Sequence, residues 1–242
     1  MIQTFSALLL AHAFADFLLQ DNRMLGGGLR PAAFVLHGVL VMATAVLCLG
    51  SASPWLFALT AAHLAVDLAH VAFPRQPGHR GGLTLFLADQ GAHLLTLTLL
   101  AVWQPDLWAG GRWADSSALP ALMAVAAGLI LTLRAGGIAI GLLMAPWADH
   151  SPKGLIGGGR AIGYLERGLI FMLILGGQPG GIGFLIAAKS VLRFGTVGDD
   201  RAVSEYVIIG TLASFGWAIL TAFLTVFLLN QLPPLGIPPL AH

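Results

Sequence analysis

The chain has 242 residues, of which 57% are hydrophobic and only 10% are charged, and its mean hydropathy is +0.85. A soluble domain carries about 25% charged residues, so this composition excludes an ordinary soluble protein and predicts a polytopic membrane protein. The net charge of +1 gives no indication of a nucleic-acid partner, and the single cysteine, Cys48, excludes an internal disulfide and a cysteine-based zinc site.

Apolar stretches follow one another along the chain, and crossing a bilayer takes about 20 residues. They cover 2–20, 31–50, 54–73, 82–103, 118–145 and about 204–230. The region 161–194 is interrupted by GGQPGGIG at 176–183, which favours either two short spans or a re-entrant hairpin. We therefore predict an all-α transmembrane helix bundle of about seven spans, within a range of six to eight. The first stretch lacks signal-peptide features and is predicted to be a retained span.

Basic residues gather in alternate loops of this predicted bundle. They are Arg23 and Arg30 after the first span, Arg75 and Arg80 after the third, and Lys153 and Arg160 after the fifth. The positive-inside rule places these loops in the cytoplasm and the N-terminus outside, in a multi-pass membrane protein. We expect a four-span block over 1–103, a C-terminal membrane block over 104–230, and a disordered Pro-rich tail over 231–242.

Histidine and aspartate recur at helical spacing in the first four spans. LLLAHAFADFLLQ contains the first such pair, HLAVDLAH the second and DQGAH the third. Because residues four apart share one face of a helix, each pair projects to one side. The seven candidate metal ligands are His12, Asp16, His37, His63, Asp67, Asp89 and His93. Gln20, His70 and Gln90 extend the same stripes and are expected to surround the ligands.

The three aspartates need compensation, because a charge at the centre of a bilayer costs roughly 2.5–3.5 kcal/mol. A divalent cation satisfies carboxylate and imidazole together, and seven donors suit one or two ions. Zinc is the first choice, and the N/O donor set also admits manganese or iron. His37 and Asp89 are the candidate catalytic residues, as proton shuttle and general base. A metal-free polar network, a proton relay and incidental polar packing remain the alternatives.

Charged residues also occur in the second half of the predicted bundle. They are Arg134, Glu166, Arg167, Lys189, Arg193 and Glu205. One interpretation is a cationic lining that faces an anionic group of a substrate. The other is a set of intramembrane ion pairs, with Glu166 bound to Lys189 or Arg193 and Glu205 bound to Arg201 or Arg193.

Several motifs together resemble a known bacterial family. They are AHAFADFLLQ, HG at 37–38, HLAVDLAH, DQGAH, GYLERGLI, GFLIAAKSVLRF and EYVIIGTLASFGW. In their order and spacing they resemble the membrane proteins grouped as domain of unknown function 3307, over most of the chain. The resemblance implies a lysine at position 70, where this chain has His70. The N-terminal block is also similar in style to inner-membrane proteins described as metal-dependent hydrolases.

Four functions are compatible with these patterns. The first is a membrane-embedded metal-dependent hydrolase acting on a lipid or an amphiphilic, including a phosphorylated, substrate. The second is a divalent-cation or proton transporter or channel, and the third is an oxidative di-iron enzyme. The fourth is a structural or partner-binding protein with a buried polar network. The predicted topology puts all seven candidate ligands at one depth, in the cytoplasmic leaflet, which favours a single site over a transmembrane relay.

Overall fold

The computed structural model of the chain describes residues 1–20, 31–72, 81–151, 155–193 and 201–234. Throughout these ranges the regular structure is helical, without a strand. Within these ranges six segments are long and apolar enough to cross a membrane: Ile2–Leu19, Pro31–Leu49, Trp55–Ala72, Gly82–Trp103, Leu119–His150 and Arg201–Leu229. The protein is thus an all-α bundle that fits a multi-pass membrane protein.

The N-terminal spans are built from α1 (Ile2–Phe14) continued by the π-helical turn η1 (Ala15–Leu19), then α3 (Pro31–Leu49), α4 (Trp55–Ala72) and α5 (Gly81–Trp103). A short 3-10 turn, η2 (Pro105–Leu107), follows. The fifth span consists of α6 (Leu119–Ile130), the π-helical turn η3 (Leu131–Ala135), α7 (Gly136–Met144) and the 3-10 segment η4 (Ala145–His150). The remaining helices are α8 (Gly158–Leu175), α9 (Gly181–Arg193) and α10 (Arg201–Leu229).

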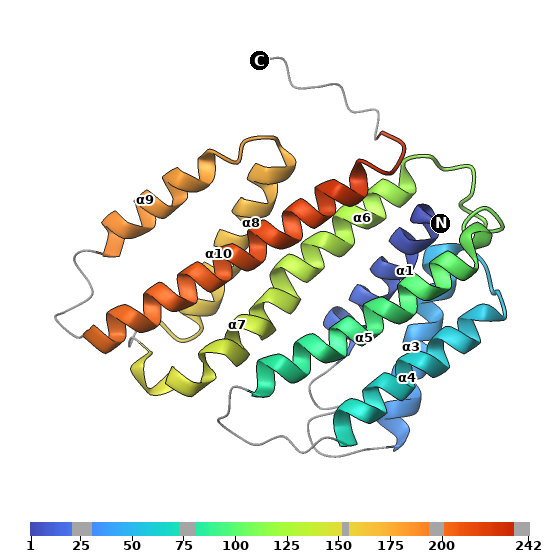
Figure 1. Cartoon of the computed structure of the whole chain (residues 1–242), viewed down its shortest axis with the longest axis horizontal. Coiled ribbons are helices and arrows are strands. Elements are labelled where there is room, and N and C mark those ends of the chain that lie inside the picture. Colours follow the sequence, from blue (N-terminus) through green and yellow to red (C-terminus); the bar gives the residue numbers. More distant parts are fainter. Residues whose placement is uncertain (21–30, 73–80, 152–154, 194–200, 235–242) are drawn as a thin grey trace.

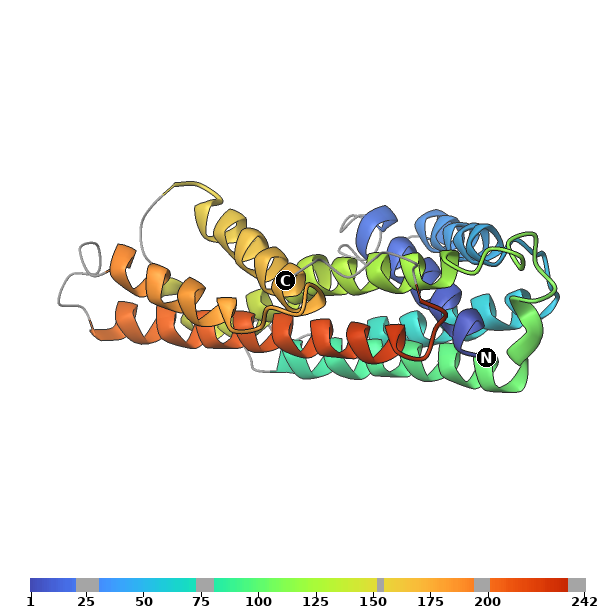
Figure 2. The ribbon, with the colours of Figure 1, turned by 90° about the horizontal axis from the view of Figure 1, so that it is seen from above.

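The helices form an elongated bundle in which neighbours in sequence are mostly neighbours in space (Figure 1). Helices α3, α4 and α5 lie toward one end of the molecule, α8, α9 and α10 lie toward the other, and α6 with α7 runs between them (Figure 1). Turned by 90°, the bundle is shallower than it is long (Figure 2). Helix α1 packs against both α3 and α6, and α10 packs against α6 and α8.

The first span is the most enclosed of the six, with 56% of its residues buried against 17–44% in the others. Its small residues make this possible: Ala7 and Ala11 are at most 3% exposed, and so are Ala124 and Ala127 of the contacting helix α6. Small side chains let two helix backbones approach closely, which is how helices in membranes gain packing contacts. The polar residues of the first span are therefore held in the middle of the protein.

One end of the bundle is tied together by loop contacts. The amino group of Met1 donates to the carbonyl of Pro105 at 2.9 Å, and the backbone N–H of Arg112 donates to the carbonyl of Gly50 at 3.0 Å. Gly50 adopts a φ of +66°, which favours glycine, as α3 ends. The N-terminus, the turn after α3 and the segment after α5 therefore share one end. The basic segments 21–30, 73–80 and 152–154 lie outside the described residues.

The region 161–194 forms two helices, α8 and α9, joined by a turn in which Gly177 has a φ of +71°. Neither helix meets the length and hydropathy of the six spans, so the count lies at the lower limit of the predicted range. The start of the predicted disordered tail is ordered, because Leu232 is only 7% exposed and belongs to the main core. Its end, 235–242, lies outside the described residues.

Two of the spans are interrupted by π-helical turns, η1 and η3. A π turn displaces the regular hydrogen-bond ladder, and backbone groups within a membrane need other partners. In η3 these are side chains: Trp217 donates to the carbonyl of Leu131 at 3.0 Å, and the Arg167 guanidinium donates to those of Thr132 and Leu133 at 3.1 Å each. The buried Arg167 also donates to Ser214 Oγ at 3.1 Å.

Replacing Arg167 by methionine should therefore destabilise the fold. Arg167→Met removes the donors of two carbonyls, and a buried acceptor left without a donor costs roughly 1–3 kcal/mol. We expect the free energy of unfolding to fall by about 2–4 kcal/mol, measured by denaturant titration in mixed micelles. Arg160→Met is the matched control, because Arg160 is exposed in the first turn of the same helix. Equal stability of the two variants would contradict this role of Arg167.

Candidate metal centre

All seven predicted ligands come together between the first four spans. Helix α1 and η1 supply His12 and Asp16, α3 supplies His37, α4 supplies His63 and Asp67, and α5 supplies Asp89 and His93. The four histidines are at most 3% exposed. The side chains of Asp16 and Asp67 are 6% exposed, and only that of Asp89 reaches 12%. Spacing along each helix aimed these pairs inward, and the packing of α1 among its neighbours brings the pairs into contact.

Four donor atoms converge at the middle of the cluster. His37 Nε2 lies 3.0 Å from His63 Nε2 and 3.3 Å from Asp67 Oδ2. His63 Nε2 lies 3.5 Å from the same oxygen. Asp16 Oδ1 lies 3.8 Å from His37 Nε2 and 3.3 Å from His63 Nε2. We call these four residues the inner group.

The spacing of the inner group matches a tetrahedral ion. Zinc binds histidine nitrogen and carboxylate oxygen at about 2.0–2.2 Å, so two donors on a tetrahedron lie roughly 3.3–3.6 Å apart. The five measured distances, 3.0–3.8 Å, bracket this value. In addition, Asp16 Oδ1 and Asp67 Oδ2 are buried and make no hydrogen bond within the described part of the chain. A cation at the centre would satisfy both oxygens.

On the side of α5, a hydrogen bond fixes the proton of His93. Its Nδ1 lies 3.0 Å from the backbone carbonyl of Asp89, which can only accept, so Nδ1 carries the proton. In the neutral ring Nε2 then carries a lone pair. This nitrogen lies 3.4 Å from Asp67 Oδ1, and it makes no hydrogen bond within the described part of the chain. Two acceptors at this distance repel each other unless a cation or a second proton lies between them.

The same logic applies to His12, through Gln90. The amide nitrogen of Gln90 donates to Asp89 Oδ2 at 3.1 Å, so its oxygen faces His12 Nε2, 3.2 Å away. His12 Nε2 must therefore carry the proton, which leaves Nδ1 as a lone pair. This nitrogen lies 3.5 Å from Asp16 Oδ2 and has no hydrogen bond among the described residues. The two outer histidines thus each present a lone pair to an aspartate of the inner group.

The donors form three overlapping groups whose ligating atoms lie within 4.8 Å of one another. The groups are His12 with Asp16 and His63, His37 with His63 and Asp67, and Asp67 with Asp89 and His93. His63 and Asp67 each belong to two groups. These buried and half-buried residues could hold a metal ion.

The residues expected to surround the ligands are placed differently from one another. Gln90 bridges two ligands as described, and His70 Nδ1 lies 3.3 Å from Asp89 Oδ1 at the edge of the cluster, where its side chain is 16% exposed. Gln20 follows η1, and its buried amide nitrogen has no hydrogen-bond partner within the described ranges.

The charges of the second half form pairs of their own. Lys189 Nζ lies 2.7 Å from both carboxylate oxygens of the buried Glu166. Arg201 binds Glu205 at 2.8 Å on the exposed start of α10. These contacts match the ion-pair interpretation, and Lys189 is occupied away from the His/Asp cluster. The side chain of Arg193 lies outside what the structure describes.

Two arginines act on backbone carbonyls instead. Arg167 donates to carbonyls of η3, as described above. Arg134 Nε donates to the carbonyl of Phe17 at 3.1 Å, and its Nη1 donates to Tyr164 Oη at 3.4 Å. Sequence reasoning missed Phe17 and Tyr164, since nothing in the local pattern shows which distant carbonyl or hydroxyl an arginine reaches.

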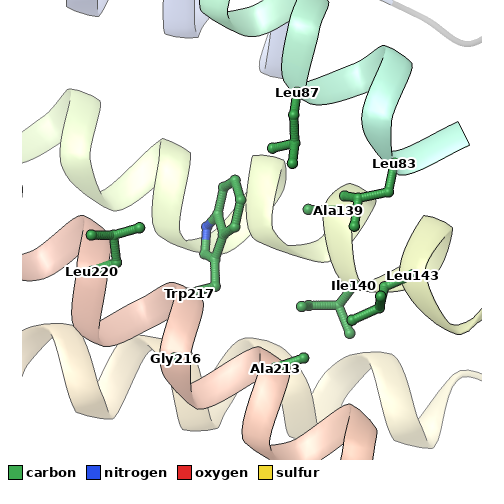
Figure 3. Close-up of a pocket in the computed structure, with 9 residues that line it drawn as sticks. All are labelled: Leu83, Leu87, Ala139, Ile140, Leu143, Ala213, Gly216, Trp217 and Leu220. Atoms are coloured by element: carbon green, nitrogen blue, oxygen red, sulfur yellow. The ribbon is translucent and has the colours of Figure 1, made fainter. Parts of the chain in front are cut away.

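An apolar hollow of about 210 Å³ lies between α5, α7 and α10 (Figure 3). It is lined by Leu83, Leu87, Ala139, Ile140, Leu143, Ala213, Gly216, Trp217 and Leu220. The Trp217 ring from α10 points toward Leu87 and Ala139 (Figure 3). No residue of the His/Asp cluster lines this hollow. The edge of the cluster at Asp89 and His70 is its most accessible part.

Comparison with known proteins bears on the N-terminal half. Residues 4–110 match the family described as "Protein of unknown function (DUF3307)", and this segment contains all seven candidate ligands. No curated protein and no solved structure matches the chain. The motifs beyond residue 110 that contributed to the resemblance lie outside the matched segment. Through residues 4–110, a little under half of its length, the chain is similar to the DUF3307 family.

Proposed function

We propose that the protein is a membrane-embedded metal-dependent hydrolase that acts on a lipid or amphiphilic substrate at the cytoplasmic leaflet. The observation that carries the metal is the orientation of His12 and His93, whose lone pairs face Asp16 and Asp67 at 3.5 and 3.4 Å. A proton between each pair would satisfy the same contacts, but it would leave the inner oxygens without hydrogen bonds. A divalent cation satisfies all of these atoms together.

The donors divide into a closed and an open position. The inner group of His37, His63, Asp16 and Asp67 supplies four donors, and five distances between them, 3.0–3.8 Å, are close to those of a tetrahedral site. The group of Asp67, Asp89 and His93 supplies only three. Catalytic zinc sites keep one position free for water or substrate, whereas structural sites use four protein ligands. We therefore assign catalysis to the second group and support to the first, with Asp67 between them.

The residues around the open position are suited to hydrolysis. Ions held there supply a Lewis acid and an activated water. Asp89 and His70 lie at the accessible edge, 3.3 Å apart, so His70 can accept a proton from the site and pass it outward. Gln90 donates a hydrogen bond of 3.1 Å to Asp89 Oδ2, which restrains this carboxylate beside His93, whose Nδ1 lies 3.8 Å away. His37 lies in the inner group, which makes it a ligand in this proposal rather than a shuttle.

The depth of the cluster suggests the kind of substrate. Asp67 precedes the end of α4 by five residues and Asp89 follows the start of α5 by eight. At 1.5 Å per residue, the cluster lies roughly 7–12 Å inside one end of the bundle. In sequence, the basic segments 21–30 and 73–80 connect the helix ends on this side, so we place it in the cytoplasm, with the N-terminus outside. At this depth the scissile bond of a lipid or amphiphile, as ester, amide or phosphoester, can reach the site.

Metal content tests the centre directly. Purified protein should contain one or two equivalents of a divalent metal, zinc first, with manganese or iron as alternatives. His63→Ala should lose it, because His63 belongs to two of the three donor groups. Elemental analysis measures the content, and His150→Ala is the control, since His150 is exposed at the end of η4. Metal-free protein that takes up none on addition would exclude the proposal.

The division into two positions predicts different losses. Asp89→Asn should reduce the metal content by the outer ion alone. It should also slow the hydrolysis of a long-chain chromogenic phosphoester in micelles by at least 100-fold, because a ligand or a general base is lost. His37→Ala, by contrast, should reduce the metal content by the inner ion as well as the outer one. The readouts are elemental analysis and rate for each variant beside wild type with and without chelator. Equal activity of Asp89→Asn and wild type would contradict the assignment of catalysis to the group of Asp67, Asp89 and His93.

The orientation has its own test, with single cysteines in a Cys48→Ala background. Ser116 and Ser151 are exposed, and Ser116 shares the end of the bundle that carries the N-terminus. In intact cells an impermeant maleimide should label Ser116→Cys, and it should label Ser151→Cys only after lysis. The reverse pattern would place the cluster in the outer leaflet.

A further inference from the structure

The two π turns in the described part of the chain lie against each other. η1 carries Asp16 of the inner group, and η3 carries Arg134. Between them Arg134 Nε donates to the carbonyl of Phe17 at 3.1 Å. Phe17 directly follows Asp16, so this hydrogen bond acts one residue from a candidate ligand. π turns occur frequently at functional sites, where they re-aim a side chain.

The turn that carries Asp16 has few other restraints at its end. Its last ladder hydrogen bond, from Gln20 to the carbonyl of Ala15, measures 2.9 Å, and the helix stops there. The Phe17 ring is buried against His12 and Phe86, with ring centroids 6.3 and 6.5 Å away. The ring is thus fixed by packing, and the carbonyl on the same residue is fixed by Arg134.

Arg134 is itself held by the second half of the protein. Its Nη1 donates to Tyr164 Oη of α8 at 3.4 Å. The turn η3 beneath it is secured by Arg167 and Trp217, from α8 and α10, through the carbonyls of Leu131, Thr132 and Leu133. A continuous set of hydrogen bonds therefore leads from α8 and α10 to the backbone beside Asp16.

We infer that Arg134 is a positioning residue, which aims Asp16 at the metal through the backbone of η1 and makes the C-terminal helices part of the site. The inference rests on the proposed metal centre. Ligand distances must hold within about 0.2 Å for tight binding, and replacing a group that orients a ligand typically weakens metal affinity 10–100-fold. Arg134 touches no candidate ligand side chain, so its effect passes through the main chain alone.

The test compares Arg134→Met and Arg134→Lys with the exposed control Arg160→Met in the full-length protein. Two readouts are used: the Co²⁺ affinity from its absorption bands, and hydrogen exchange of the metal-free protein over residues 12–20. Arg134→Met should weaken Co²⁺ binding 10–100-fold and speed exchange in η1. Arg134→Lys, which keeps one donor, should recover part of both, and the control should change neither.

The outcomes separate the two proposals. Unchanged exchange in η1 and unchanged affinity in Arg134→Met would overturn the positioning role while leaving the metal centre intact. Faster exchange everywhere in the chain would also overturn it, because this would indicate general destabilisation. If wild type binds no Co²⁺, the metal centre fails, and exchange confined to η1 still decides whether Arg134 holds the turn.

Discussion

Buried carboxylates determine how the N-terminal helices must be arranged. Within hydrocarbon no water can stabilise an ionised aspartate, so each one needs a cation or a donor at contact distance. Asp16 and Asp67 lie 6% exposed among imidazole nitrogens, and two of those nitrogens, on His12 and His93, have their protons committed elsewhere. The first four spans converge at these two aspartates, where hydrogen-bond donors are fewest. The close approach of the alanine faces of α1 and α6 allows the first span to sit at that point.

Buried charged and polar residues have different roles in the two halves of the protein. In the N-terminal spans, polar side chains are left with unsatisfied acceptors, which is the condition for binding a cation. In the C-terminal half, Arg167 and Lys189 are satisfied internally, by carbonyls and by Glu166. Buried charge there supports the irregular turn η3 and the packing of α9 on α8. The distinction between site and support therefore follows from the hydrogen bonds each group lacks or makes, and the residue types alone do not reveal it.

Much of this arrangement could be predicted from the sequence. Apolar length predicted the spans, and the i, i+4 spacing of His and Asp predicted which faces meet, because both are local properties of a helix. The π turns, the tautomers of His12 and His93 and the reach of Arg134 could not be predicted, since each depends on contacts between residues far apart in sequence.

A π turn also has a consequence for how the first span can change over evolutionary time. Such a turn accommodates one residue more than a regular helix of the same length, so a single-residue deletion within 15–19 would convert it to α-helix. The residues before the turn would keep their direction relative to those after it, because the turn absorbs the extra residue. Asp16 lies within the turn, so its carboxylate would change direction relative to the alanine face of α1. The length of this segment is therefore tied to the direction in which Asp16 points.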